Sequence, residues 1–441
     1  MRIALVIPPV KDLYFTPQRA SFLGVHTIAR LLEERGIEHR VFSGVRTRGR
    51  PVPVPDEVSY LAEYLGREGF FTGYKRFGIT AELLARQVVE YAPDMAFVSC
   101  FAYGYAEEAI EVIDALKAQF PGMLVVAGGP GVTAYPDYFL RHSRVDVVAP
   151  GSAEQSIGPL ILDPYSAPGA RFRKSGGDIA ANPFAPDDTS FKPVTTLMRE
   201  SHDTMYYSAM LSRGCPRRCS FCSVRLSFPH YGWARGADIL SMIGRIPRTG
   251  KRVHVNFEDD NLLEEFERFA EVLAALDLHT GGNFSFSMEN GARYALLDPD
   301  RIRALMRYRI TQLNLPLVTR DERLRIAAGR PAPYADFTAI AAECTRAGIP
   351  VVAYLIAGLP GEGAESVREG IEFLNGLRVL VGISPFYPVP GIAGYEDPRA
   401  FDGIPPRRCT GMSFFPWHDI GTAAMVGLFR LARRANLGVH D

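Results

Sequence analysis

Residues 211–222 read LSRGCPRRCSFC and place Cys215, Cys219 and Cys222 in one short loop. Three thiolates at a C-x₃-C-x₂-C spacing can bind three irons of a four-iron, four-sulfur cube and leave the fourth iron without a protein ligand. Iron–sulfur sites usually take four cysteines, so a compact set of three indicates an iron that is open to another molecule. The stretch therefore predicts a redox cluster that binds its own substrate directly.

The same cysteines allow a second interpretation. Zinc sites are normally closed by four nitrogen or sulfur ligands, and His230 could supply the fourth ligand. The iron–sulfur interpretation is favoured because the residues that follow are patterned like a barrel enzyme.

At these residues the chain resembles the radical S-adenosylmethionine (SAM) enzymes. Their signature is C-x₃-C-x-aromatic-C, and Phe221 fills the aromatic position; Arg213-Gly214-Cys215-Pro216 resembles members that carry an N-terminal cobalamin-binding domain. The resemblance implies a [4Fe-4S] cluster bound by the three cysteines, with SAM chelating the open iron beside Phe221. It also implies a 5′-deoxyadenosyl radical, formed when one electron from the cluster cleaves the sulfonium, which is chemistry that belongs to the cofactor.

The composition is that of an ordinary globular protein. The 441 residues suggest two or three domains, and 47% are apolar and 22% charged. With 49 basic and 49 acidic residues, nothing predicts a nucleic-acid partner or a membrane-attracting surface. No stretch approaches the ~20 apolar residues of a membrane-spanning helix. The six cysteines show no disulfide pattern, which predicts a reducing, cytoplasmic location.

Residues 1–162 are patterned as one domain. Short apolar segments at 3–7, 37–43, 95–99, 123–127 and 145–148 alternate with helical patterns, which predicts an α/β fold with a doubly wound, flavodoxin-like parallel sheet. Ligands of such sheets bind at the carboxyl ends of the strands. The residues there resemble the cobalamin-binding family, which implies that cobalamin contacts Ser99, Cys100, Gly128, Gly129, Pro130, Gly131, Gly151 and Ser152.

This domain also departs from the cobalamin-binding pattern. The family often shows Asp-x-His-x-x-Gly with a cobalt-ligating histidine, whereas this chain has Asp12-Leu13-Tyr14-Phe15, and GSAE at 151–154 stands where GEGE is more usual. Radical enzymes of this class commonly lack that histidine. A flavodoxin-like domain without a cofactor is the alternative, and a nicotinamide site is disfavoured because no G-x-G-x-x-G follows the first strand.

Residues 163–205 are rich in Pro, Gly, Asp and Ser and predict a surface linker. Residues 206–391 then repeat a strand–helix pattern six times, which resembles the partial (β/α)₆ barrel of the radical SAM family. The expected strands are 206–213, 252–257, 283–287, 310–315, 350–356 and 379–384. Residues 392–441 form a C-terminal extension.

The carboxyl ends of the expected barrel strands supply the candidate SAM-binding residues. Glu258, Asp259 and Asp260 would repel one another in a core but suit a cationic ligand, and they resemble the segment that receives the SAM amino group. A helix cap formed by Asp260 or Asn261 is the alternative.

The later strand ends add weaker candidates. Glu289 is expected at the ribose or amino group and Arg293 at the carboxylate, although a Glu289–Arg293 ion pair at i and i+4 is equally compatible. The resemblance also implies that Asn314 contacts SAM, but the match to the family is weak here because the apolar Leu317 and Val318 follow it. The turn at Ala357, Gly358 and Pro360 resembles the family's turn that contacts the adenine of SAM. The alternative is that this turn only connects a strand to a helix.

The C-terminal extension contains aromatic residues that either cover the barrel or simply pack, namely Phe414, Phe415 and Trp417. Cys409 is expected to be a buried structural thiol rather than a radical-quenching one. His418 is a weak candidate acid or base.

The resemblance makes methylation of an unactivated carbon the leading function. The adenosyl radical would abstract hydrogen, methylcobalamin would supply the methyl group, and a second SAM would remethylate the cobalt. A radical cyclase, rearrangement or lyase enzyme on the same scaffold is the nearest alternative, and a zinc or iron–sulfur regulatory protein the more distant one. The expected partners are a small-molecule or peptide substrate, selected by the C-terminal extension and residues 45–79, and a flavodoxin or ferredoxin reductant.

Overall fold

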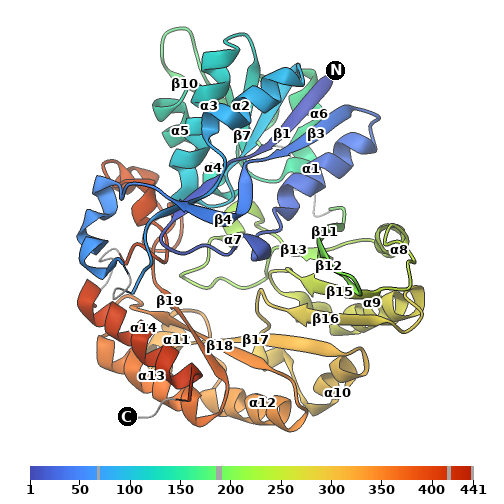
Figure 1. Ribbon diagram of the computed structural model, residues 1–441, viewed down its shortest axis with the longest axis vertical. Coiled ribbons are helices and arrows are strands. Elements are labelled where there is room, and N and C mark those ends of the chain that lie inside the picture. Colours follow the sequence, from blue (N-terminus) through green and yellow to red (C-terminus); the bar gives the residue numbers. More distant parts are fainter. Residues whose placement is uncertain (67–69, 185–190, 415–418, 439–441) are drawn as a thin grey trace. The chain divides into compact units, whose positions relative to one another are not determined.

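The computed structural model describes residues 1–66, 70–184, 191–414 and 419–438. The chain forms two compact units (Figure 1). The first comprises Met1–Thr189, Ser223–Pro229 and Pro388–Phe415, and the second comprises Ser190–Cys222, His230–Tyr387 and Pro416–Asp441. Phe415, Trp417 and His418 lie outside the described residues.

The first unit contains the expected parallel sheet. Its five parallel strands are β1 (Arg2–Ile7), β3 (Glu38–Ser43), β6 (Met95–Ser99), β7 (Leu124–Gly128) and β8 (Val147–Ala149). They lie in the order β8-β7-β6-β1-β3, the order of flavodoxin-like folds. The doubly wound prediction is confirmed.

Helices cover both faces of this sheet. Alternate residues of a strand point to opposite faces, and Ile3, Leu5 and Ile7 of β1 pack in one core cluster with residues of α1 (Leu23–Glu33) and α6 (Ala153–Leu162). α2 (Ala81–Glu90) and α3 (Ala106–Gln119) contact each other and the sheet strands β3 and β6. The carboxyl end of β7 leads into α4 (Pro130–Ala134) and α5 (Pro136–His142).

Residues 163–205 are more ordered than their composition predicts. They form β9 (Arg171–Arg173) and β10 (Ile179–Ala181), which extend the first sheet beside β8 in antiparallel pairing, and β11 (Val194–Glu200), which pairs antiparallel with the first barrel strand. These short edge strands lie within the expected linker, and the boundary between the two units also falls inside it. The sequence did not predict these strands, because short edge strands in a Gly- and Pro-rich segment show little apolar periodicity.

Two strands of the 45–79 region form a small sheet with a short strand that follows β1. β2 (Val10–Asp12), β5 (Lys75–Gly78) and β4 (Val45–Pro51) pair antiparallel in that order. This sheet continues directly from the carboxyl end of β1.

The second unit has the six parallel strands that the sequence predicts. They are β12 (Thr204–Met210), β15 (Arg252–Phe257), β16 (Phe284–Met288), β17 (Ile310–Val318), β18 (Val351–Ala357) and β19 (Leu380–Pro385), adjacent in that order. Figure 1 shows them as a curved sheet with helices on its outer side. The partial-barrel prediction is confirmed.

The outer helices follow the strands in sequence. They are α8 (Gly236–Gly244), α9 (Phe266–His279), α10 (Pro299–Arg307), α11 (Glu322–Ala327), α12 (Tyr334–Arg346), α13 (Ala364–Gly376) and the C-terminal α14 (Thr422–Asn436). Aromatic contacts join strand and helix: the Phe269 ring of α9 lies edge-on to Phe257 at 5.1 Å and to Phe286 at 5.9 Å. The Asn436 amide of α14 binds both backbone polar groups of Val381 in β19.

The C-terminal extension divides between the two units. Its described residues before 415 belong to the first unit, where Phe414 packs against Phe70 and Phe71, and α14 belongs to the second. Cys409 is buried, as a structural thiol should be. Among the described residues, no helix has the length and apolar character required to cross a bilayer.

Candidate active site

The cysteine loop leaves the carboxyl end of β12. It begins with β13 (Ser212–Arg213), which pairs with β14 (Gly232–Trp233), and turns at Gly214, where φ is +76°. That left-handed conformation favours glycine. Cys215 and Cys222 are half-buried and Cys219 is buried.

The carboxylates after β15 bind the start of this loop. Asp259 is 3% exposed, and its Oδ1 accepts hydrogen bonds from the backbone of Leu211 at 2.9 Å and from the Ser212 hydroxyl at 2.6 Å. Asp260 Oδ2 accepts from the Gly214 amide at 3.0 Å. Burial raises the pKa of Asp259 to about 7 and also raises the pKa of Asp260. The two side chains therefore hold the start of the loop in position. Their expected contact with SAM stays a prediction.

A turn after α11 contacts the middle of the loop. The Arg330 Nε donates to Cys219 Sγ at 3.1 Å, and the Arg330 guanidinium lies 5.9 Å from the centre of the Phe221 ring. Gly329, at φ +77°, lies so close that a Cβ there would be 3.2 Å from Cys219 Cα. Sequence reasoning did not identify Arg330, because nothing local distinguishes it from the other arginines.

The donor set at this loop fits an iron–sulfur cube. The described residues contain no group of three or more His, Cys, Asp or Glu side chains gathered for a single metal ion. The cysteines of a cube bind different irons and need not converge on one point. An N–H donor on a cysteine sulfur is also the kind of contact that tunes such clusters.

The remaining candidate residues at the second and third strand ends lie near this loop but bind different partners. Glu258 accepts from the Ser208 hydroxyl at 2.7 Å, and Glu289 Oε1 accepts from the Ser287 hydroxyl at 3.3 Å. Arg293 lies 3.5 Å from Glu264. Burial lowers the pKa of Arg293, and the positive charges of Arg217 and Arg330 lower it further. The three guanidinium groups therefore lie near one another.

The later strand ends are fixed by buried polar side chains. Asn314 is fully buried and donates to the Glu289 carbonyl at 2.5 Å. After β18, Glu362 accepts from the backbone amides of Gly358 at 3.1 Å and Leu359 at 3.3 Å, and from the Thr319 hydroxyl at 2.5 Å. Glu362 therefore sets the conformation of the turn that contains Ala357, Gly358 and Pro360, and their contact with adenine stays a prediction.

The inner face of the barrel carries a polar network that the sequence analysis did not include. His254 contacts the hydroxyls of Ser285 at 3.1 Å and Ser287 at 3.2 Å, and Ser287 donates to Asn256 at 3.1 Å. Burial lowers the pKa of His254 to about 4, so the imidazole is neutral near pH 7. On the next strand, Gln312 donates to Asn314 at 2.8 Å.

This network follows from strand register. His254 pairs with Ser285 and with Tyr206, and Asn256 with Ser287, so these side chains share one face, while the alternating Val253, Val255 and Phe257 are buried on the helix side. Barrel interiors are normally filled with Val, Ile and Leu. The alternation of polar and apolar residues in VHVNFE and SFSME was the signal that would have found this face.

In the first unit, the candidate cobalamin residues form tight turns at the carboxyl ends of β6, β7 and β8. Gly129 has φ +101°, Gly131 donates to the Cys100 carbonyl at 2.9 Å, and the Gly151 amide donates to the Thr133 hydroxyl at 2.9 Å. Ser99, Gly128, Gly151 and Ser152 are half-buried and Pro130 is exposed. These glycines pack closely on neighbouring atoms: a Cβ on Gly129 would lie 2.7 Å from the Cys100 carbonyl oxygen, and a Cβ on Gly151 would lie 3.5 Å from the Phe184 ring. Their expected contact with cobalamin stays a prediction.

Cys100 is the most deeply buried side chain among the candidate cobalamin residues that carry one, and its thiol donates to the Ala102 carbonyl at 3.2 Å. Its thiol is buried and lies where a Cβ on Gly131 would be only 2.4 Å away. The thiol therefore packs against the glycine turn, and the expected contact of Cys100 with cobalamin stays a prediction. Tyr14, which stands where the family's histidine would, is 65% exposed.

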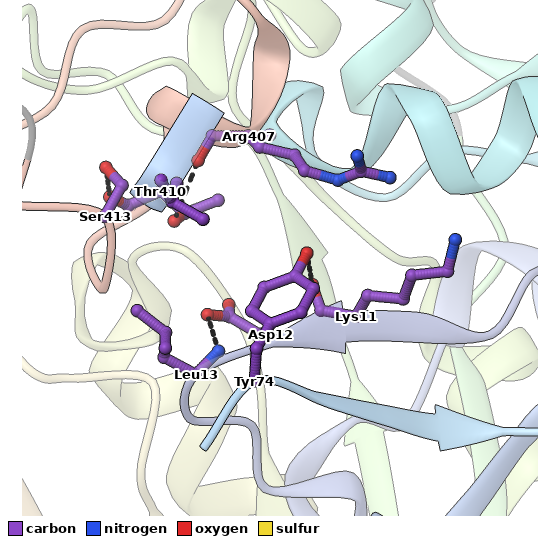
Figure 2. A pocket seen from close by; sticks show the side chains of 9 residues that line it. Lys11, Asp12, Leu13, Tyr74, Arg407, Thr410 and Ser413 are labelled. Carbon is purple, nitrogen blue, oxygen red and sulfur yellow. Dashed lines mark hydrogen bonds between the residues drawn. The ribbon is translucent and has the colours of Figure 1, made fainter. Parts of the chain in front are cut away.

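A small pocket lies beside β2 in the first unit (Figure 2). Asp12 accepts from the Tyr105 hydroxyl at 2.7 Å, and burial raises the pKa of Asp12 to about 6. Arg407 enters from the C-terminal segment and pairs with Glu107 at 2.6 Å and with Glu108 at 3.0 Å. The lining residues are Lys11, Asp12, Leu13, Val58, Tyr74, Gly104, Arg407, Thr410 and Ser413. These ion pairs attach residues 406–413 to the first unit.

Two family models match the chain. Residues 210–374 match the Radical SAM superfamily, and residues 44–159 match the B12 binding domain. The chain therefore combines a radical SAM domain with an N-terminal cobalamin-binding domain, as the cysteine loop and the glycine turns predicted. These domains imply a [4Fe-4S] cluster, SAM and cobalamin as cofactors.

Curated relatives share part of the chain. It is 29% identical over 207 residues to the cobalamin-dependent radical SAM methyltransferase TokK of Streptomyces tokunonensis, covering 42% of this chain and 27% of that one. It is 28% identical over 198 residues to a 2-(S-pantetheinyl)-carbapenam-3-carboxylate methyltransferase of Streptantibioticus cattleyicolor, covering 41% and 26%. The match spans about a quarter of the length of these relatives.

Solved structures share the fold. The radical SAM methyltransferase TsrM of Kitasatospora setae, with cobalamin and a [4Fe-4S] cluster bound, superposes with a TM-score of 0.66 at 14% identity, covering 91% of this chain and 77% of that one. The cobalamin-dependent SAM radical enzyme OxsB, with aqua-cobalamin and SAM bound, gives 0.61 at 13% identity, covering 85% and 52%. Both share the two-domain α/β architecture.

Proposed function

We propose that this chain is a cobalamin-dependent radical SAM methyltransferase that methylates a carbon atom of a polar small molecule. The observation that carries the proposal is the three-cysteine loop with its Arg330 contact, in a chain that also has a cobalamin-binding domain. The curated relatives that match are named as methyltransferases.

Each part of the site has a defined task in this proposal. When bound, the cluster and SAM supply a 5′-deoxyadenosyl radical, and methylcobalamin supplies the methyl group. Asp259 and Asp260 fix the start of the cysteine loop, and Glu362 fixes the turn assigned to the adenine. The glycine turns after β7 and β8 are the expected contacts of the corrin.

The polar inner face of the barrel supports a polar substrate. This face carries His254, Asn256, Ser285 and Ser287 at positions where apolar side chains would also fit. Burying polar groups costs free energy unless they are hydrogen-bonded. Glu258 and Glu289 continue this face at the ends of β15 and β16. We infer a substrate rich in N–H and O–H groups, bound with its reacting carbon toward the cysteine loop.

The test uses anaerobically reconstituted protein with cobalamin, a strong reductant and SAM carrying a labelled methyl group, incubated with a pool of polar small molecules. Methylation predicts that 5′-deoxyadenosine and S-adenosylhomocysteine form together and that label enters one pool component. Deoxyadenosine without S-adenosylhomocysteine, together with an altered but unlabelled product, would instead indicate a cyclase, lyase or rearrangement reaction.

A further inference from the structure

The Arg330 side chain, which lies outside the cysteine loop, donates a hydrogen bond to the sulfur of a cluster cysteine. Its Nε donates to Cys219 Sγ at 3.1 Å. The side chain is half-buried, so the contact lies in a medium less polar than water. Cys219 itself is buried at 9% exposure.

One further contact of the guanidinium and the close packing of the neighbouring Gly329 fix the position of the turn that carries Arg330. The guanidinium lies over the Phe221 ring at 5.9 Å, within the range of a cation–π contact. The backbone of Gly329 packs directly on Cys219 and on the Arg218 carbonyl. A turn that contacts three residues of the cysteine loop has a defined position relative to the sulfur.

A buried arginine supports the turn from behind. Arg325 is fully buried, and its Nη1 donates to the Arg330 carbonyl at 3.0 Å and to the Ala332 carbonyl, which also accepts from the Tyr294 hydroxyl at 2.7 Å. Burying a guanidinium is costly unless it satisfies specific acceptors. The hydrogen bonds of Arg325 therefore hold the backbone of residues 329–332 in a defined conformation.

We propose that Arg330 is a positioning residue that raises the reduction potential of the cluster bound at Cys215, Cys219 and Cys222. One-electron reduction adds a negative charge to the cluster, and part of this charge resides on the cysteine sulfurs. A cationic N–H donor on one sulfur stabilises the reduced form more than the oxidised form, since hydrogen bonds to sulfur and local charge set such potentials. The one electron comes from the external reductant and no bond is broken in this step. This inference rests on the proposed iron–sulfur function.

The experiment is a redox titration of the anaerobically reconstituted full chain, without SAM or cobalamin, followed by the electron paramagnetic resonance signal of the reduced cluster. Arg330→Met removes both charge and donor, and we expect its midpoint potential to be more negative than that of the wild type. Arg330→Lys keeps the charge without the fork of donors, and we expect a smaller shift in the same direction. The control is Arg303→Met, an exposed arginine on α10 that pairs with Asp300, for which no shift is expected.

The outcomes separate the two claims. A wild-type protein that holds no iron–sulfur cluster overturns the proposed function, whereas clusters of equal iron content and equal potential in the wild type and Arg330→Met overturn only the role of Arg330. Should Arg330→Met fail to hold iron, Arg330→Gln replaces it as the neutral variant: a negative shift supports the inference and an unchanged potential contradicts it.

Discussion

Glu108 shows how single buried charges shape the first unit. It is 1% exposed and pairs with Arg407, yet burial outweighs that ion pair and raises the pKa of Glu108 to about 7. Asp12, which lines the small pocket beside β2, has a pKa raised to about 6 by burial. Both carboxyls therefore bind protons more tightly in the folded protein than in the unfolded chain.

This direction gives a pH prediction. Because the folded state holds more protons between the ordinary carboxyl pKa and the raised value, the free energy of unfolding should fall as pH rises from about 4.5 to 7. Glu108→Gln should flatten that fall by about 1–3 kcal/mol, measured by denaturant unfolding at pH 5 and pH 8. Glu90→Gln, at an exposed position at the end of α2, is the control. A pH dependence identical in Glu108→Gln and wild type would contradict the assignment.

Gly329 is a second single residue whose effect can be tested, because its turn contacts the cysteine loop. Its φ is +77° and a Cβ there would lie 3.2 Å from Cys219 Cα and 3.3 Å from the Arg218 carbonyl oxygen. Gly348 has a similar φ of +71° with nothing within 4 Å. The two positions separate backbone strain from contact with the cysteine loop.

We expect Gly329→Ala to cost about 1–3 kcal/mol and to lower the iron content of reconstituted protein, since the added methyl displaces the cysteine loop. Gly348→Ala should cost a similar amount through its φ alone and leave the iron content unchanged. Iron and sulfide analysis with thermal unfolding checks both. Equal iron content in the two variants would show that the turn does not position Cys219.

At the scale of elements, β15 shows the two faces of the barrel wall most clearly. Phe257 is 2% exposed and packs against α9, whereas His254 and Asn256 lie half-buried on the inner face. In a packed core, changes on the two faces would cost similar free energies of unfolding, whereas in a ligand-binding interior the change on the outer face costs more.

Phe257→Ala should therefore destabilise the protein by about 3–5 kcal/mol. His254→Leu should cost only about 1–2 kcal/mol, because the Ser285 and Ser287 hydroxyls each lose one hydrogen-bond contact. The same His254→Leu variant should still cleave SAM under strong reductant but lose methylation of the substrate. Chemical denaturation and product analysis measure the two effects. A large loss of stability in His254→Leu would mean that the inner face is a structural core.

The elements that the sequence predicts well are those with strong periodicity. Five parallel strands in the first unit and six in the second appear close to their expected residues, because long apolar runs between helices leave few alternatives. β9, β10 and β11 escaped prediction, since short edge strands in Gly- and Pro-rich sequence owe their pairing to the neighbouring sheet. The polar alternation on β15 and β16 was present in the sequence but was not used.

For the whole molecule, local motifs predicted the cofactors better than the contacts. The cysteine loop and glycine turns identified both domains from a few residues. The partners of Asp259, Glu362 and Arg330 depend on tertiary distances between strand ends, which no local pattern encodes. The expected tail of residues 392–441 divides between the two units for the same reason.

The central claim is that three cysteines leave one iron open to SAM. The most direct measurement is the electron paramagnetic resonance spectrum of the reduced, reconstituted protein before and after addition of SAM, with iron and sulfide analysis of the same sample. The account predicts about four iron and four sulfide per chain and a spectrum that changes when SAM binds, both absent from Cys219→Ala. One zinc without sulfide, or an iron–sulfur spectrum that saturating SAM leaves unchanged, would contradict it.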